Sequence, residues 1–543
     1  MTFSNLQRQE VKQRLESETW DLLVIGGGIT GAGIALDAVS RGLRVALVEM
    51  QDFAAGTSSR STKLVHGGLR YLKQFEIKIV AEVGKEREIV YENGPHVTTP
   101  EWMMLPFYKG GTFGPLSTNV GLRVYDFLAG VKKAERRKML SGEEALTREP
   151  LLKKEGLKGA GYYVEYKTDD ARLTMEVMKK AVELGALAIN YVKVNSFIYE
   201  QGKIVGVHLQ DQLNRTAFEA RATTVVNAAG PWVDTLREAD GSRTGKSLLL
   251  TKGIHLVFDQ QQFPLRQAIY FDGEDGRMIF AIPREGKTYV GTTDTVYKED
   301  PTHPTLTKED VDYVLAAIRY QFPDLKLTEN DVESTWSGVR PLIHEDGKSP
   351  SEISRKDEVF ESESGLLSIA GGKLTGYRKM AEQIVDRVLQ VQGRPATKTK
   401  TQHLPLSGGD VGGSAGFRAF KQQQLKRAAE LRIAPNEAEL LIQRYGSNVE
   451  KLFTLYTEAP AAELDPLTYA MLEYGIMEEL VYTPADFFVR RTGALFFHID
   501  WVREKKLAVQ NYLADRFNWS EEESKRHQHE LETLLIDAVE PIE

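Results

Sequence analysis

The motif Gly26-x-Gly28-x-x-Gly31 constrains this chain more than any other feature, because it stands where a strand passes into a helix. An apolar run typical of a buried strand precedes it, residues 29–41 have helical spacing, and residues 44–50 form a second apolar run. The short connections between these segments predict a parallel βαβ unit. The first glycine permits a tight turn, the second lets a pyrophosphate approach the backbone, and the third packs helix on strand. We therefore predict dinucleotide binding at this turn.

The acidic residue Glu49, at the end of the second apolar run, indicates which nucleotide to expect. A carboxylate here accepts hydrogen bonds from both ribose hydroxyls and disfavours a 2′-phosphate, so NADP is not expected. The N-terminus of the intervening helix presents unpaired N–H groups and its positive dipole end to the phosphates. A plain glycine-rich turn is the alternative, and the strand, the helix, the spacing and the acid together argue against it.

Segments beyond this unit favour a flavin over a nicotinamide cofactor. Residues 56–72 (GTSSRSTKLVHGGLRYL) are rich in hydroxyl groups, glycines and basic side chains, as suits a loop around a pyrophosphate, a ribityl chain and a flavin ring. Residues 225–232 (VVNAAGPW) form a second strand and turn with small residues. An NAD domain is usually one contiguous block, whereas here the strand-like segments are scattered. They lie at residues 187–198, 203–210, 223–230, 287–294 and 365–372, the last leading into a predicted helix at about 374–389.

After about residue 404 a glycine-rich stretch gives way to helical patterns. We therefore predict an α/β fold class, with a Rossmann-type FAD-binding domain assembled from discontinuous segments. A mixed-sheet substrate (cap) region is interleaved with it, and a C-terminal all-α domain follows. The expected bounds are 1–390 for the FAD-dependent oxidoreductase region (FAD binding mainly 18–75, 150–235 and 345–390; substrate or cap region mainly 76–149 and 236–344), 391–413 for a linker and 414–543 for the helical domain.

Composition excludes several other classes. The chain has no cysteine, so disulfides, cysteine-ligated zinc, Fe–S clusters and cysteine nucleophiles are excluded, and a reducing cytoplasm is the expected compartment. A net charge of −8 argues against a dedicated nucleic-acid binder. The polar N-terminus shows no secretory signal, and the longest uncharged apolar stretch, residues 22–36, is shorter than the roughly 20 residues of a membrane span. No metal-ligand spacing is visible, so no metal is expected.

Several motifs, in order over nearly the whole chain, carry a resemblance to a known family. They are GGGITGAGIALDAVSRG (26–42), TSSRSTKLVHGGLRYL (57–72), TDDARL (168–173), VNAAGPWVD (226–234), YVGTTD (289–294), WSGVRPL (336–342), GGKLTGYRKMAE (371–382) and the tail stretch VYTPADFFVRRT (481–492). Together they resemble the FAD-dependent (aerobic, respiratory) glycerol-3-phosphate dehydrogenases, within the D-amino-acid-oxidase-like flavoprotein superfamily. The wider superfamily shares the first motif without the others.

The resemblance implies FAD as the cofactor and assigns its contacts position by position. The ADP-binding fingerprint is Gly26, Gly28, Gly31 and Glu49. A helix N-terminus near residue 374 would face the pyrimidine end of the flavin, where its positive end stabilises the charge of the reduced ring. The other implied cofactor residues are Thr57, Ser58, Ser59, Lys63, His66, Gly67, Gly68, Val194, Ala229, Gly230, Trp232, Asp294, Gly372, Leu374 and Thr375.

On the substrate side the resemblance implies a phosphate clamp and a proton acceptor. Arginine suits the clamp, because its planar fork binds phosphate oxygens bidentately. Taken alone, each such residue is more often a solvated charge or a structural histidine. The implied substrate-binding residues are Arg70, Tyr71, His255, Arg340, Arg355 and Lys373, and His255, Arg340 and Lys373 are the expected catalytic residues. His255 and Lys373 both stay open as the proton acceptor.

The resemblance implies oxidation of sn-glycerol 3-phosphate to dihydroxyacetone phosphate, with hydride transfer to FAD and electrons passed to a membrane quinone. The alternative is a glycerol-3-phosphate oxidase that reduces oxygen to hydrogen peroxide. That branch carries an extra insertion in its middle, for which no spare segment is visible here. A non-catalytic flavin- or nucleotide-binding protein is a third interpretation, against which the complete set of Arg70, Arg340 and Lys373 argues.

The expected partners are glycerol 3-phosphate, a quinone and a membrane surface contacted peripherally. A homodimer is allowed, and nucleic acid is not expected. The expected location is the cytoplasm, at the inner face of the cell membrane. The basic run VKKAERRKML (131–140) has two interpretations: a solvated helix face, which is the commoner case, or a contact with anionic lipid, where each basic residue contributes about 1 kcal/mol.

Overall fold

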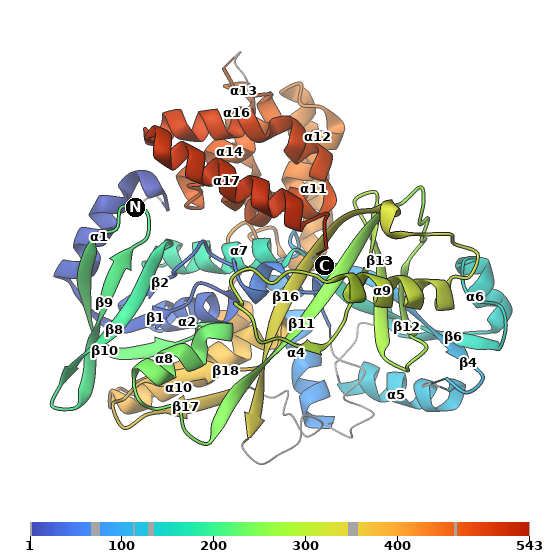
Figure 1. The fold of residues 1–543 in the computed structure, drawn as a ribbon, viewed down its shortest axis with the longest axis horizontal. Helices are drawn as coiled ribbons and strands as arrows, with labels where there is room; N and C mark the ends of the chain where they lie inside the picture. Colours follow the sequence, from blue (N-terminus) through green and yellow to red (C-terminus); the bar gives the residue numbers. More distant parts are fainter. Residues whose placement is uncertain are drawn as a thin grey trace.

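Two β-sheets lie side by side, and a layer of C-terminal helices crosses over both (Figure 1). This arrangement confirms the predicted α/β fold class with a C-terminal helical region. The computed structural model describes residues 3–66, 77–111, 114–128, 135–345, 357–460 and 464–541.

The predicted βαβ unit forms the centre of the first sheet. β1 (Thr19–Ile25) runs parallel to β2 (Val45–Val48), and α2 (Ile29–Ser40) connects them. Alternate side chains of β1 enter two different hydrophobic cores, with Leu22 on the side of α2 and Leu23 on the opposite side. A strand buried on both faces reads as a continuous apolar run, which explains the sequence signal.

The first sheet continues on both sides of this unit, in the order β17-β18-β10-β1-β2-β7. β18, β10, β1, β2 and β7 are parallel, as a Rossmann-type sheet requires, and β8 and β9 extend β10 as an antiparallel arm. These added strands are β7 (Leu187–Ile189), β8 (Val192–Glu200), β9 (Lys203–Asp211), β10 (Ala217–Asn227), β17 (Glu358–Glu361) and β18 (Leu367–Ala370).

The prediction of one strand-like segment at 187–198 is wrong, because this stretch contains two strands, β7 and β8. Tyr191 between them has a left-handed backbone, with φ of 56°. Its N–H donates to the carbonyl oxygen of Gln51 at 2.8 Å, and its own carbonyl accepts from the N–H of Gln212 at 2.7 Å. These two backbone hydrogen bonds hold the chain out of strand geometry.

The second sheet is mixed and has the order β15-β11-β14-β13-β12-β4-β6-β3, with β16 paired to β11 and β5 to β6. Its longest pairing, between β11 and β16, places His255 opposite Trp336 and Thr251 opposite Arg340. Its strands are β3 (Leu64–Val65), β4 (Thr98–Tyr108), β5 (Lys138–Leu140), β6 (Leu157–Thr168), β11 (Lys246–Asp259), β12 (Ala268–Asp272), β13 (Met278–Arg284), β14 (Lys287–Gly291), β15 (Thr295–Val296) and β16 (Val332–Glu345). The helical interpretation of the basic run 131–140 is therefore wrong for its last three residues, which pair with β6 as β5.

Helices cover the faces of both sheets. α2, α7 and α10 pack on one face of the first sheet, while α1 and the β8–β9 arm pack on the other. α9 packs on one face of the second sheet. The bounds are α1 (Arg8–Ser17), α4 (Ile77–Asn93), α5 (Pro115–Leu128), α6 (Gly142–Arg148), α7 (Asp170–Glu183), α8 (Val233–Ala239), α9 (Lys308–Gln321) and α10 (Tyr377–Val391).

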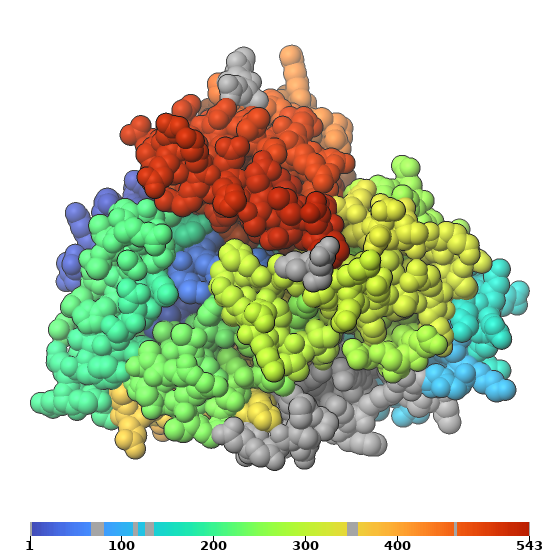
Figure 2. Space-filling model, viewed as in Figure 1, coloured from blue at the N-terminus to red at the C-terminus, as the bar shows by residue number. Residues whose placement is uncertain are grey.

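The C-terminal helices share a hydrophobic core with the other face of the second sheet. Tyr289 and Trp336 of that sheet belong to the same buried cluster as Phe496 and Phe497. Figure 2 shows the red C-terminal surface in direct contact with the yellow part of the chain. The helices are α11 (Gly413–Glu430), α12 (Pro435–Tyr445), α13 (Val449–Thr457), α14 (Pro466–Glu478), a π-helical segment (Asp486–Arg491), α15 (Ala494–Phe497), α16 (Ile499–Phe517) and α17 (Glu521–Asp537). None of the helices in the described ranges is long and apolar enough to cross a bilayer.

Candidate active site

A cavity of about 1420 Å³ lies between the two sheets, and residues of both line it. The glycine turn after β1 and the loop after β2 border one part of it. Side chains of β11, β13 and β16 border another, including His255, Phe280 and Arg340. A nucleotide-binding turn and a set of polar side chains therefore open into one continuous space.

The glycine turn allows no side chain at two of its three positions. Gly26 has φ of 112°, and a Cβ there would lie 2.5 Å from the carbonyl oxygen of Ala228. A Cβ at Gly31 would overlap the carbonyl oxygen of Gly26. Gly28 lines the cavity directly, and the backbone N–H of Ile29 donates to the hydroxyl of Ser58 at 3.0 Å. The bare backbone that an approaching pyrophosphate requires is thus present.

Glu49 is held in place by the backbone of its own neighbourhood. Its carboxylate accepts hydrogen bonds from the N–H of Gly27 at 2.6 Å and of Gln51 at 2.8 Å. Burial raises the pKa of Glu49, while these two N–H groups act to lower it. Val194 lines the same part of the cavity, close to where the N–H of Val192 donates to the carbonyl of Glu49 at 2.7 Å. The acid therefore stands at a fixed position at the nucleotide end.

The middle of the cavity is built where distant segments meet. Thr57 donates to the carbonyl oxygen of Val339 at 2.6 Å, which ties the loop after β2 to β16. Trp232, in the turn after β10, packs against Gly56, where a Cβ would lie 3.2 Å from the indole ring. These contacts bring the described part of the first predicted cofactor segment, residues 56–66, and the second segment, 225–232, to one wall.

The chain before α10 forms a further wall. The hydroxyl of Thr375 accepts a hydrogen bond from the N–H of His66 at 3.0 Å and donates to its carbonyl oxygen at 3.1 Å. Burial lowers the pKa of the His66 imidazole to about 3, with the charges of Lys373 and Arg87 acting in the same direction. Lys373, Leu374 and Thr375 therefore lie beside the end of the 56–66 loop.

Arg340 presents a guanidinium at the cavity, with its side chain one-third exposed. The group donates to the hydroxyl of Thr292 at 2.9 Å and to the carbonyl of Thr293 at 3.1 Å, and it lies 3.4 Å from Asp294. It also packs over Gly253, where any Cβ would clash with it. The hydroxyl of Thr292 and the carbonyl of Thr293 thus orient this fixed positive charge.

His255 lies on the same face of the β11–β16 pair, because it faces Trp336 while Thr251 faces Arg340, and only 1% of its surface is exposed. Its Nε2 is 3.1 Å from the hydroxyl of Thr62, and its buried Nδ1 has no hydrogen-bond partner among the described residues. Burial lowers the pKa of this imidazole well below its usual value, and the charges of Arg340 and Lys63 lower it further. The ring is therefore neutral and retains a nitrogen that can accept a proton.

Most of the residues expected from the sequence come together around this cavity. They are Gly26, Gly28, Glu49, Thr57, Ser58, His66, Val194, Ala229, Gly230, Trp232, His255, Asp294, Arg340, Gly372, Lys373, Leu374 and Thr375. Gly31, Ser59 and Lys63 do not line it. The ammonium of Lys63 is buried against Asp170 at 2.6 Å and the carbonyl of Ser59 at 2.9 Å. Gly67, Gly68, Arg70, Tyr71 and Arg355 lie outside the described residues.

Sequence reasoning missed three residues that shape the substrate side. Trp336 stacks on His255, with ring centroids 4.6 Å apart and planes 13° from parallel. Thr62 bonds the same ring, and Thr292 bonds Arg340. All three lie inside the quoted motifs WSGVRPL, TSSRSTKL and YVGTTD, so these motifs were the available signal.

Comparisons with known proteins found two matching family models and several similar proteins. Residues 21–378 match the family described as FAD dependent oxidoreductase, and residues 399–524 match the C-terminal domain of alpha-glycerophosphate oxidase. The aerobic glycerol-3-phosphate dehydrogenase of Bacillus subtilis is 61% identical over 100% of this chain and 99% of its own length. That of Staphylococcus haemolyticus is 57% identical over 99% and 98%. The crystal structure of the glycerol-3-phosphate dehydrogenase from Bacillus halodurans complexed with FAD has a TM-score of 0.88 at 52% identity, covering 100% of this chain and 99% of that one.

Proposed function

Because the chain belongs to the FAD-dependent glycerol-3-phosphate dehydrogenase family, we propose that it oxidises sn-glycerol 3-phosphate to dihydroxyacetone phosphate and passes the electrons to a membrane quinone. The observation that carries this proposal is the cavity itself. Its lining includes the glycine turn at Gly26 and Gly28, which suits a dinucleotide, and also Arg340 and the neutral His255.

The residues present fit FAD. Gly26 and Gly28 leave the backbone bare for a pyrophosphate, and Glu49 offers a carboxylate for the ribose hydroxyls. Hydroxyl-bearing and small residues line the middle of the cavity, and the helix start at Leu374 and Thr375 faces it. When bound, FAD supplies the acceptor of the hydride that leaves the carbinol carbon of the substrate.

Arg340 is the proposed phosphate ligand. A dianionic phosphate distinguishes glycerol 3-phosphate from glycerol, so recognition requires fixed positive charge, and guanidinium binds two phosphate oxygens at once. Thr292 and the carbonyl of Thr293 already orient this group. Asp294, at 3.4 Å, is a weaker partner that a phosphate can outcompete.

His255 is the proposed acceptor of the hydroxyl proton. The reaction removes a hydride from carbon and a proton from oxygen, and the carbonyl bond forms between the two atoms. A neutral imidazole that lines the cavity suits the second task, because one of its two ring nitrogens carries no proton. Substrate binding strengthens it as a base, because a phosphate on Arg340 compensates the charge that lowers the pKa of His255. Lys373, which also lines the cavity, is the alternative acceptor.

The electron acceptor has a second candidate. Residues 399–524 match the C-terminal domain of alpha-glycerophosphate oxidase, which supports oxygen as the alternative electron acceptor. The test is a visible spectrum of the purified protein, followed by anaerobic addition of glycerol 3-phosphate. Bleaching of a flavin band supports the dehydrogenation, and its absence contradicts it. Reoxidation by a quinone analogue without peroxide supports the quinone, whereas stoichiometric peroxide in air supports the oxidase.

A further inference from the structure

We propose that the C-terminal helical domain positions the proton acceptor of the active site, and this inference rests on the role proposed above for His255. The two phenylalanines of α15, Phe496 and Phe497, hold the indole of Trp336, and Trp336 holds the imidazole. The C-terminal helices line no part of the described cavity wall, so they act on His255 through these rings.

An unbroken series of ring contacts leads from α15 to the cavity. The ring centroid of Trp336 lies 5.3 Å from that of Phe496 and 5.7 Å from that of Phe497. At the other end of the series Trp336 stacks on His255, with ring centroids 4.6 Å apart. Tyr289 closes the group, with centroids 5.4 Å from Trp336 and 5.8 Å from Phe497. All five side chains are buried, so a change in one ring moves its neighbours.

Hydrogen bonds fix the edges of the same rings. The indole N–H of Trp336 donates to the carbonyl of Ser61 at 3.1 Å, and the next residue, Thr62, bonds the imidazole. The hydroxyl of Ser334 donates to the carbonyl oxygen of Phe496. The phenol of Tyr289 donates to the carbonyl of Thr62 at 3.0 Å. The position of His255 therefore depends on Trp336, and the position of Trp336 depends on Phe496 and Phe497 of α15.

The segment before α15 anchors it to the first sheet. The π-helical segment carries Arg490 and Arg491, which both bind the buried Asp52 of the loop after β2. Gly493, with φ of 66°, then turns the chain into α15. Twelve consecutive residues, 486–497, thus contact the nucleotide side through charges and the substrate side through rings.

Two cations face His255 from the elements packed around it. Arg340 extends from β16, and Lys63 lies over the rings of Trp336 and Phe496, with its ammonium 5.5 and 5.4 Å from their centroids. Lys63 is paired with Asp170. Loosening the phenylalanines would admit water to the imidazole, and renewed solvation moves a lowered histidine pKa back up towards its usual value.

The experiment compares Phe496→Leu with Phe453→Leu in the full-length holoenzyme. Phe453, in α13, is equally buried in the same cluster but contacts neither Trp336 nor His255 in the described ring pairs, so it controls for lost packing. We measure flavin content, Tm and the anaerobic rate of flavin reduction by glycerol 3-phosphate across pH. For Phe496→Leu we expect an unchanged flavin content, a rate of flavin reduction about tenfold lower, and a KM within about twofold of the parent. The acidic side of its pH–rate profile should shift to higher pH. Phe453→Leu should lower Tm alone, and identical behaviour of the two variants would overturn the proposal.

A second series separates this inference from the proposed function. His255→Gln should slow flavin reduction, and Phe496→Leu should add little in that background, because both act through one group. A normal rate for His255→Gln would contradict the proposed acceptor. A slow His255→Gln with a normal Trp336→Leu would instead contradict the positioning. If Phe496→Leu fails to fold, Trp336→Phe against Trp336→Leu answers the same question, since only phenylalanine retains the stack and should retain the rate.

Discussion

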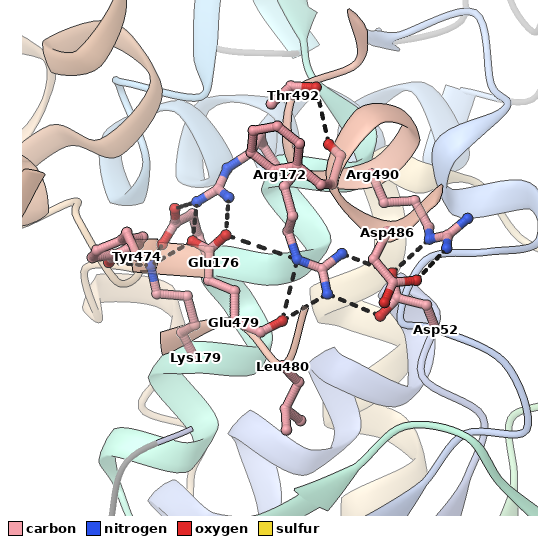
Figure 3. A network of polar contacts seen from close by, with 12 residues as sticks. Asp52, Arg172, Glu176, Lys179, Tyr474, Glu479, Leu480, Asp486, Arg490 and Thr492 are labelled. Atoms are coloured by element: carbon pink, nitrogen blue, oxygen red, sulfur yellow. Dashed lines mark hydrogen bonds and ion pairs between the residues drawn. The ribbon is translucent and has the colours of Figure 1, made fainter. Parts of the chain in front are cut away.

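Arg491 donates two hydrogen bonds to the carboxylate of Asp52, at 2.7 and 2.8 Å, across 439 positions of chain. Arg490 adds a third at 2.5 Å, and Figure 3 shows its guanidinium facing the same carboxylate. Burial alone would raise the pKa of Asp52, but the two arginines lower it to about 2. Since the loop of Asp52 is bonded to the glycine turn through Ala54 and Gly27, the C-terminal domain braces the nucleotide end of the site.

A second buried cluster lies beside this pair (Figure 3). Glu479 accepts two hydrogen bonds from Arg172 of α7, at 2.7 and 2.8 Å, and one from Lys179 at 3.2 Å. The carbonyl of Glu479 also accepts from Arg491. The two clusters are therefore continuous, and each charge in them has an opposite charge or a carbonyl as its partner.

Arg491→Ala should destabilise the protein by about 3–5 kcal/mol, because it leaves the buried charge of Asp52 with fewer partners. The loop after β2 should loosen with it, so FAD should dissociate faster. Denaturant unfolding and the fluorescence of released flavin measure the two effects. Arg427→Ala, which breaks an exposed pair with Glu430, is the control and should change stability by less than about 0.5 kcal/mol. Equal effects would show that the brace contributes nothing.

Glu49→Gln should weaken FAD binding by roughly 1.5–3 kcal/mol, because the ribose hydroxyls lose a charged acceptor. The amide keeps the size of the side chain and one acceptor for the N–H groups of Gly27 and Gln51. Equilibrium dialysis of the apoprotein against FAD measures the change. Full flavin retention after prolonged dialysis would remove Glu49 from the ribose site.

Arg340→Lys should be impaired and Arg340→Ala more so, by at least about 100-fold in kcat/KM, equivalent to about 2.7 kcal/mol. Lysine keeps the charge but loses the bidentate fork, and alanine loses both. Flavin content should stay normal. The loss should shrink with glycerol as substrate, since the missing contact is then irrelevant. A near-normal kcat/KM for Arg340→Ala with glycerol 3-phosphate would exclude the residue from the clamp.

His96 should make the protein less stable as the pH falls below about 6.5. Burial lowers the pKa of this imidazole in the folded protein to about 3. Below about pH 6.5 the unfolded chain therefore binds a proton at His96 that the folded chain does not bind, which favours unfolding. In His96→Asn this contribution is absent, so the variant should gain about 2 kcal/mol relative to the parent between pH 7 and pH 5. Asp52 and Glu479 do not interfere, because both carboxylates are present in parent and variant, and their lowered pKa values reduce stability only below about pH 5. The same difference in unfolding free energy between variant and parent at pH 7 and at pH 5 would contradict the prediction.

Charge reversal in the basic run should lower binding to anionic vesicles if that run is the lipid contact. The residues to change are Lys132, Lys133, Arg136 and Arg137, of which the last also donates to Asn119 at 2.9 Å. Cosedimentation with vesicles containing phosphatidylglycerol measures the binding, and each lost basic residue should cost about 1 kcal/mol. Reversal of four basic residues on α11, Arg418, Lys421, Lys426 and Arg427, provides a matched control. Unchanged binding would leave the run as a solvated face.

The nucleotide-binding unit could be predicted from the amino-acid sequence alone. Its signals are local: a buried strand, a glycine turn, a helix start and an acid at the next strand end all fall within residues 19–49. Short-range backbone geometry permits few alternatives to such a pattern, so the turn at Gly26 and the position of Glu49 could be predicted. The C-terminal helices were also predictable, since helical periodicity is repeated within each segment.

Which distant side chains meet depends on how the sheets and helices pack against one another. The register of β11 on β16 places Trp336 beside His255, and the docking of the C-terminal helices places Arg491 on Asp52. In its local sequence pattern Trp336 does not differ from an ordinary buried tryptophan, and Arg491 does not differ from a surface arginine. Contacts of this kind depend on the packing of whole sheets and helices against one another, and that packing is a property of the folded chain rather than of any segment of it.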